Sequence, residues 1–167
     1  GVVVENSNVR LENSRVKYAL YPVWILNTTW QGKKYWAKDD GTFYTGVCDI
    51  NGKKYYFLED GEQITKEGWY LTNGTYYWIN ANGTRRDDEL FQYDGNYYYV
   101  DKNGVMATSG WVYWDYNYYY PRSWGGMYKN AFITYDNNLY YLGSDSKMAI
   151  GWQSIGGNTY YFRNWGG

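Results

Sequence analysis

Hydrophobic positions fall in short runs that glycines interrupt, and pairs of aromatic residues recur within these runs at a nearly constant spacing. The pairs are separated by 20 to 22 residues. Tyr-Tyr pairs begin at Tyr55, Tyr76, Tyr98, Tyr119, Tyr140 and Tyr160, and Tyr35-Trp36 lies one unit before them. A pattern that returns this often at one period predicts a chain built from one repeated supersecondary unit.

A turn dipeptide precedes most of the aromatic pairs. These dipeptides are Asn51-Gly52, Asn73-Gly74, Asp94-Gly95 and Gly156-Gly157. They are the residues of a two-residue type I′ hairpin turn, because both central positions require a positive φ. A second glycine follows each pair by about six residues, at Gly41, Gly61, Gly83, Gly104, Gly125 and Gly166, and Ser146 takes its place in the Tyr140 unit. Each unit therefore predicts a strand, a tight turn, a second strand and a glycine-containing loop.

One such hairpin is marginally stable in water, because it cannot bury its own apolar face. Neighbouring hairpins must then stack, as the units of repeat proteins do. The predicted fold is all-β, a solenoid of stacked two-stranded antiparallel hairpins with about 21 residues per repeat and about seven repeats in residues 31–167.

Residues 1–30 lie outside the clear register. The stretch Val16–Trp30 is rich in strand-forming residues and predicts strands that begin or cap the stack. Residues 1–15 are polar and rich in asparagine, which fits either an edge strand or a linker.

The composition agrees with many small interfaces between stacked hairpins rather than one large aliphatic core. The chain has 24 Tyr and 10 Trp, so aromatic residues make up 23% of it. Tyr and Trp have an apolar body and a polar tip, which suits half-exposed seams between hairpins. The net charge of −1 gives no electrostatic reason to expect a nucleic-acid partner. No apolar run approaches the roughly 20 residues of a membrane span, and the single cysteine, Cys48, is interpreted as a small core or turn residue.

Catalytic chemistry has little support in the sequence. Histidine is absent, which removes the commonest general base and zinc ligand. A hydrolase with paired carboxylates is a formal alternative, with Asp39–Asp40 and Asp87–Asp88 as its candidates, but both pairs lie in polar stretches typical of loop tips. We therefore predict no catalytic residue, no metal site and no cofactor.

Gly-Trp dipeptides form a second periodic pattern with a longer spacing. They occur at Gly68-Trp69, Gly110-Trp111 and Gly151-Trp152, two repeats apart, and Met106, Met127 and Met148 each lie two residues after the glycine position of a loop. Two interpretations stay open. These side chains fill gaps between repeats, or they join tyrosines in partly open aromatic pockets that bind quaternary ammonium groups by cation–π attraction or sugars by stacking. Several weak sites along one chain would add avidity.

These motifs resemble the cell-wall-binding repeats of Gram-positive surface proteins, a superfamily that includes choline-binding repeats, glucan-binding repeats and the C-terminal repeats of large clostridial toxins. The resemblance covers about residues 31–167. It is carried by "GWYLTNGTYYWINANG" from Gly68, "YDGNYYYVDKNGVMATSGW" from Tyr93, "GWQSIGGNTYYF" from Gly151 and "INGKKYYFLEDGEQITKEGW" from Ile50.

The resemblance implies a secreted, non-catalytic module on the bacterial cell surface. Its expected partner is a cell-wall polymer, either a choline-decorated teichoic acid or a polysaccharide. The alternatives are an adhesin or toxin receptor-binding solenoid that contacts a host glycan or protein, and a structural spacer. Unpaired hairpin faces at the ends of a solenoid add end-to-end homodimerisation as a hypothesis.

The resemblance also implies the ligand-binding positions. In the choline-binding subgroup the residue before Tyr-Tyr is usually a Trp that forms a cage wall; here Tyr97 and Tyr118 supply an aromatic residue, whereas Lys or Thr there is more like the carbohydrate-binding variants. The best candidate is therefore the repeat with Trp111, Tyr118 and Met127, completed by Tyr140 or Tyr141 of the next hairpin. The full set of candidate ligand-binding residues is Trp69, Tyr76, Tyr97, Trp111, Tyr118, Met127, Tyr140, Tyr141, Met148 and Trp152.

Overall fold

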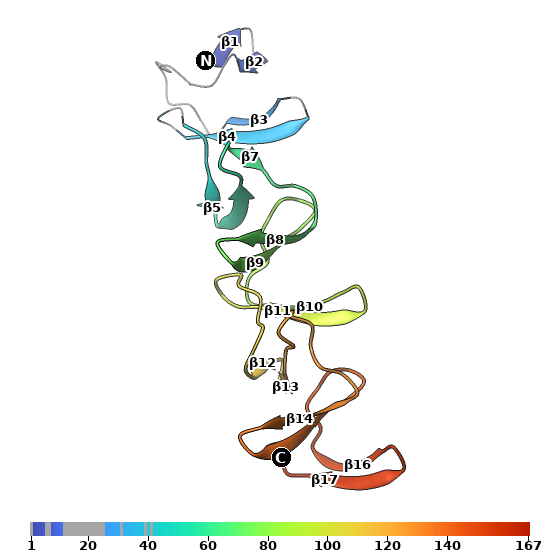
Figure 1. The fold of residues 1–167 in the computed structure, drawn as a ribbon. Helices are drawn as coiled ribbons and strands as arrows, with labels where there is room; N and C mark the ends of the chain where they lie inside the picture. Colours follow the sequence, from blue (N-terminus) through green and yellow to red (C-terminus); the bar gives the residue numbers. More distant parts are fainter. Residues whose placement is uncertain (1, 6–7, 12–25, 31, 39, 41) are drawn as a thin grey trace. The chain divides into compact units, whose positions relative to one another are not determined.

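The structure is a computed structural model that describes residues 2–5, 8–11, 26–30, 32–38, 40 and 42–167. The chain divides into two compact units, Gly1–Arg86 and Asp87–Gly167. Among the described residues the regular structure consists of strands paired antiparallel, with no helix (Figure 1). The prediction of an all-β fold made of antiparallel hairpins is confirmed.

The first unit contains two hairpins and a five-stranded sheet. Strands β1 (Val2–Glu5) and β2 (Asn8–Leu11) form one hairpin, and β8 (Gly68–Thr72) and β9 (Thr75–Ile79) form another. Between them lie β3 (Leu26–Trp30), β4 (Lys33–Ala37), β5 (Gly46–Ile50), β6 (Lys53–Phe57) and β7 (Glu62–Gln63), in the order β3-β4-β7-β6-β5.

The short strand β7 is what joins two hairpins into one sheet. Its two residues pair with β4 on one side, and Gln63 pairs with Phe57 of β6 on the other. The buried Gln63 side chain accepts a hydrogen bond from the Trp36 indole N–H at 2.8 Å, and Lys33 pairs with Glu62 at 2.6 Å. The sequence pattern predicted separate hairpins here and did not predict this junction.

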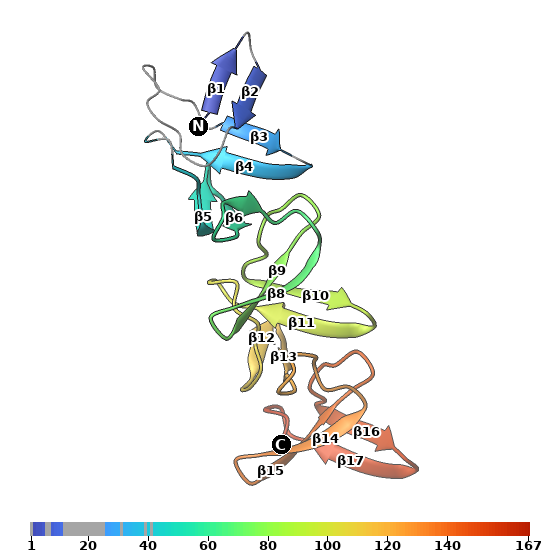
Figure 2. The ribbon, with the colours of Figure 1, turned by 45° about the horizontal axis from the view of Figure 1, so that its top comes forward.

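The second unit is a succession of four hairpins (Figure 2). They are formed by β10 (Glu89–Tyr93) with β11 (Asn96–Val100), β12 (Val112–Trp114) with β13 (Asn117–Tyr119), β14 (Ala131–Tyr135) with β15 (Asn138–Leu142), and β16 (Gly151–Ile155) with β17 (Asn158–Phe162).

The hairpin turns have the backbone conformation that the sequence predicted. At Asn51-Gly52, for example, φ is 55° and 73°, so both central residues lie in the left-handed region that the type I′ turn requires. The same signs occur at Asn73-Gly74, Asp94-Gly95 and Gly156-Gly157. Two further turns, Asp115-Tyr116 and Asp136-Asn137, reach positive φ without a glycine.

Successive hairpins are joined by backbone hydrogen bonds as well as by side chains. In the second unit the amide N–H of Met127 donates to the carbonyl of Tyr97, and that of Met148 donates to the carbonyl of Tyr118, both at 2.8 Å. In the first unit Arg85 donates to the Lys54 carbonyl in the same way, at 2.7 Å. Each acceptor is the residue before a Tyr-Tyr pair. Because a carbonyl serves this purpose in any residue, stacking leaves the side chain at that position free to vary.

The core of each unit is a series of small clusters. In the second unit Val112, Tyr119 and Met127 form one cluster, and Ile133, Tyr140 and Leu142 form the next. Of the predicted N-terminal segment 1–30, residues 12–25 lie outside the described residues. Leu26–Trp30 is the first strand of a hairpin with β4.

Candidate functional site

An aromatic cluster in the second unit is built around Trp111, which lies just before β12. Side chains alternate between the two faces of a hairpin. Val112 and Tyr119 pair across the strands and point into one core cluster. The neighbouring residues Trp111 and Tyr120 therefore lie on the opposite face, where their ring centroids are 5.1 Å apart at an interplanar angle of 80°.

The next hairpin supplies two more rings. Tyr140 of β15 pairs with Ile133 of β14, and Tyr135 lies two residues further along β14, so all three side chains share one face. The Tyr140 ring centroid lies 4.9 Å from that of Trp111, and the Tyr135 centroid lies 6.1 Å away. Tyr135 also contacts Tyr120, and the centroids of these two rings are 5.8 Å apart.

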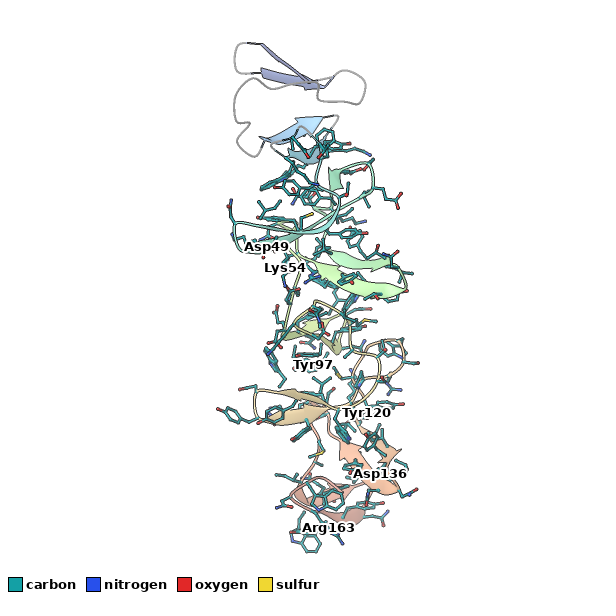
Figure 3. The ribbon with its side chains drawn as sticks, turned by 90° about the vertical axis from the view of Figure 1, so that its left-hand side faces the viewer. Asp49, Lys54, Tyr97, Tyr120, Asp136 and Arg163 are labelled. Atoms are coloured by element: carbon teal, nitrogen blue, oxygen red, sulfur yellow. The ribbon has the colours of Figure 1, made fainter. Side chains whose placement is uncertain are left out.

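Tyr118 of β13 completes the arrangement, with its ring centroid 6.3 Å from that of Trp111 and perpendicular to it at 88°. We call Trp111, Tyr118, Tyr120, Tyr135 and Tyr140 the Trp111 cage. Figure 3 labels Tyr120, and also Asp136, which follows Tyr135 in the turn between β14 and β15.

The base of the cage is buried, and two of its outer rings are exposed to solvent. Tyr140 is only 8% exposed and rests on the core formed with Ile133 and Leu142. Tyr118 and Tyr135 are 44% and 42% exposed, and Trp111 and Tyr120 are half-buried. The exposed rings of Tyr118 and Tyr135 offer π density that attracts a cation without hydrogen-bond donors.

The structure brings some of the predicted site residues together and places others elsewhere. Trp111, Tyr118 and Tyr140 meet in the cage, and Met148 packs against the same core cluster. Met127 lies on the opposite face of the β12–β13 hairpin, 1% exposed, in the cluster with Val112 and Tyr119; Tyr97 packs against that cluster too.

The remaining candidates lie outside the cage. Tyr141 contacts Phe132 at 4.9 Å between ring centroids. Trp152 is 73% exposed and lies 5.0 Å from Tyr161 across the last hairpin. In the first unit Trp69 lies edge-on to Trp78 at 5.2 Å, and Tyr76 is 42% exposed. Their roles in ligand binding stay predictions.

Sequence reasoning missed two cage residues, Tyr120 and Tyr135. The signal for Tyr120 was present, because counting outward from the turn at Asp115-Tyr116 places it opposite Trp111. Tyr135 stands directly before the turn at Asp136-Asn137. This turn contains no glycine, so it lacks the dipeptide that marks most of the other turns. Recognising both turns would have assigned both rings.

Two of the carboxylates considered as alternatives for catalysis, Asp40 and Asp88, accept hydrogen bonds from neighbouring residues. Asp40 accepts hydrogen bonds from the Thr42 amide at 2.9 Å and the Thr42 hydroxyl at 2.6 Å, and these bonds lower the pKa of Asp40. Its partner Asp39 lies outside the described residues. Asp88 accepts a hydrogen bond from the Tyr99 hydroxyl at 2.7 Å. Burial and this bond raise the pKa of Tyr99 to about 12, so the hydroxyl stays protonated and continues to donate at neutral pH.

The described residues contain no group of three or more His, Cys, Asp or Glu side chains placed to hold a metal ion. Within the same residues, no helix has the length and apolar character needed to cross a membrane.

Comparison with known proteins links these repeats to a family. A family model described as "putative cell wall binding repeat" matches residues 49–62, 88–106, 130–145 and 150–167. No curated protein sequence matches the chain.

Solved structures from Streptococcus pneumoniae share the fold. CbpJ superposes with a TM-score of 0.73 at 24% identity, and choline binding protein F with a TM-score of 0.70 at 26% identity. Each alignment covers 84% of this chain and 50% of the other, so the chain spans about half the length of these relatives. The choline-binding domain of CbpL superposes with a TM-score of 0.50 at 27% identity, over 74% of this chain and 76% of that domain.

The matched segments coincide with hairpins β10–β11, β14–β15 and β16–β17 of the second unit and with β6 of the first. These segments of the chain therefore match the cell-wall-binding repeat.

Proposed function

We propose that the chain is a non-catalytic binding module that attaches a surface protein to a cell-wall polymer by holding choline-type quaternary ammonium groups of that polymer. The observation that carries the proposal is the Trp111 cage, with Trp111, Tyr118 and Tyr135 at its open side and Tyr140 at its base. The proposal implies that the module lies on the outside of a Gram-positive cell.

The chemistry of the rings favours a quaternary ammonium group over other ligands. A trimethylammonium group has no hydrogen-bond donor, so aromatic faces replace its hydration shell with little loss. The five rings of the cage carry no formal charge, so a small anion would find no opposite charge there. Each cation–π contact is worth about 0.5–1 kcal/mol at an exposed site, which predicts weak binding at one cage.

Weak binding at one cage suits a polymer that carries many copies of its ligand. Once one cage is occupied, a second site on the same chain meets its ligand at a high effective concentration. The solved structure of choline binding protein F, whose name states its ligand, supports choline as the ligand class at 26% identity.

Retention on choline-substituted agarose tests this function. We expect the chain to bind the resin and to elute with free choline, because the free ligand competes for the same rings. Unsubstituted agarose is the control for the matrix, and cross-linked dextran tests the polysaccharide alternative.

Retention on dextran alone would favour a glucan ligand and count against choline. Retention on neither resin would contradict the proposal and leave the adhesin or spacer alternatives.

End-to-end dimerisation stays a separate prediction, which sedimentation of the chain with and without choline would test.

A further inference from the structure

Four Asn-Gly dipeptides occur in the sequence, and they lie in two kinds of turn. Asn51-Gly52 and Asn73-Gly74 form the tips of hairpins β5–β6 and β8–β9, whereas Asn82-Gly83 and Asn103-Gly104 lie in the loops after β9 and β11. In this dipeptide the asparagine side chain condenses readily with the next backbone amide, because glycine has no side chain that obstructs the approach. The four dipeptides share this local chemistry, so their surroundings determine which of them reacts.

The reaction converts asparagine to aspartate or isoaspartate without an enzyme. The glycine amide nitrogen loses its proton and attacks the side-chain Cγ of asparagine. The new N–Cγ bond closes a five-membered imide ring, and the Cγ–Nδ2 bond breaks as Nδ2 takes up a proton and leaves as ammonia. Water then opens the ring. Cleavage at Cγ gives aspartate, and cleavage at the main-chain carbonyl carbon gives isoaspartate. The reaction therefore requires a glycine amide that is open to water and makes no hydrogen bond.

The two loop dipeptides hold this amide in a backbone hydrogen bond. The Gly83 N–H donates to the carbonyl of Asn80 at 2.8 Å, and the Gly104 N–H donates to the carbonyl of Asp101 at 2.7 Å. Both glycines are also buried. Attack at either position would first have to break a short hydrogen bond away from water, so both loops are protected.

The tip of hairpin β5–β6 is protected by a side chain. The Gly52 N–H donates to the carboxylate of Asp49 at 3.0 Å, and Figure 3 labels this aspartate. A carboxylate is too weak a base to remove an amide proton, and its negative charge opposes the negative charge that the nitrogen must acquire. Asn51 is exposed, yet the carboxylate keeps its neighbouring amide unreactive.

Hairpin β8–β9 lacks this protection. The residue that corresponds to Asp49, two places before the turn, is Leu71, which is 58% exposed and offers no side-chain acceptor. Asn73 and Gly74 are both exposed, and the Gly74 amide makes no hydrogen bond within the described part of the chain. A Cβ built on Gly74 would meet no atom within 4 Å, so the turn has room to move into the geometry of attack.

We propose that Asn73 is a site of spontaneous deamidation, distinguished from the other three Asn-Gly dipeptides by its exposed glycine amide without a hydrogen bond. Aspartate adds a negative charge at the tip of hairpin β8–β9. Isoaspartate lengthens the main chain between Thr72 and Thr75, which pair across the turn. The Thr72 hydroxyl also accepts a hydrogen bond from the Tyr56 hydroxyl at 2.9 Å, so a change of register there disturbs the contact with hairpin β5–β6. The proposal is independent of the proposed function, because it concerns a turn of the first unit.

The test incubates the intact chain at mildly alkaline pH, folded and, in parallel, unfolded in guanidinium chloride. Peptide mapping by mass spectrometry measures the deamidated fraction at each asparagine. In the folded chain Asn73 should react at least about tenfold faster than Asn51, Asn82 and Asn103, which corresponds to about 1.4 kcal/mol in activation free energy. In the unfolded chain the four sites should react at similar rates, because only the shared dipeptide remains. A preference for Asn73 that persists in the unfolded chain would contradict the structural explanation.

Two reciprocal variants test the role of the carboxylate. Leu71→Asp gives hairpin β8–β9 the acceptor that β5–β6 has, and Asp49→Leu removes that acceptor from β5–β6. Both positions are exposed, so both variants should fold. Leu71→Asp should slow deamidation of Asn73 about fivefold or more, and Asp49→Leu should accelerate that of Asn51 by a similar factor. Equal rates at Asn51 and Asn73 in the folded wild type, or an unchanged rate at Asn73 in the Leu71→Asp variant, would overturn the inference.

Discussion

Replacement of Trp111 with leucine is expected to weaken choline binding at the cage about tenfold or more, a loss of about 1.4 kcal/mol. Trp111 is the one ring in contact with all four of the other cage residues. Its removal therefore takes away the central aromatic ring of the cage. Leucine retains apolar volume against Tyr140 and the core beneath it. The measurement is the choline-induced shift of the ring-proton resonances of Tyr135 and Tyr140, which reports this site alone.

Trp124→Leu is the matched control, because Trp124 is a half-exposed tryptophan of the same unit whose ring contact, among the described residues, is with Tyr98 outside the cage. It should leave the choline titration at Tyr135 and Tyr140 unchanged. Equal loss of choline binding in both variants would mean that Trp111 acts through packing and that the cage is not the binding site.

Leu142→Ala is expected to lower the free energy of unfolding of the second unit by about 2–5 kcal/mol. Leu142 is fully buried in the cluster with Ile133 and Tyr140, and Met148 packs against the same cluster. Truncation leaves a cavity below the cage that the surrounding hairpins fill only in part. Urea unfolding followed by tyrosine and tryptophan fluorescence measures the loss.

The same strand provides the comparison. Leu139 lies three residues earlier in β15 and is 48% exposed, so Leu139→Ala should change the free energy of unfolding by no more than about 0.5 kcal/mol. A similar loss in both variants would contradict the assignment of the core to one face of this hairpin.

The elements that the sequence predicted well are those fixed by short-range geometry. The dipeptide Asn51-Gly52 selects its turn through φ alone, and the alternation of the flanking residues then assigns each side chain to a face. For the same reason, most aromatic pairs could be placed on second strands, such as Tyr55-Tyr56 in β6 and Tyr140-Tyr141 in β15.

Contacts between hairpins were harder to predict, because they depend on how one hairpin lies on the next. Trp111 was expected beside Tyr140 or Tyr141 because of the family resemblance, and it contacts Tyr140. The face that Met127 occupies depends on the loop after β13, whose amide at Met127 bonds back to Tyr97 rather than forward toward the cage. No periodic pattern in the sequence indicates which carbonyl accepts the hydrogen bond from the Met127 amide.

The five-stranded sheet of the first unit illustrates the same limit. In the second unit the corresponding loops form single bridges, such as Leu142 with Met148. In the first unit Glu62 and Gln63 both pair with β4, and Gln63 pairs with Phe57 of β6 as well. The difference depends on side chains that meet across the loop, including the indole of Trp36 and the amide of Gln63. Such a pairing becomes visible when the hairpins are placed in space.

The central claim, that the Trp111 cage recognises positive charge through aromatic faces, is tested most directly by comparing choline with 3,3-dimethyl-1-butanol. This alcohol has the same shape and replaces the charged nitrogen with carbon. The resonances of Tyr135 and Tyr140 should shift and saturate with choline at millimolar concentration, and the neutral alcohol should bind at least about tenfold more weakly, because it lacks the cation–π contribution. Equal affinity for the two compounds, or no response to choline, would contradict the account.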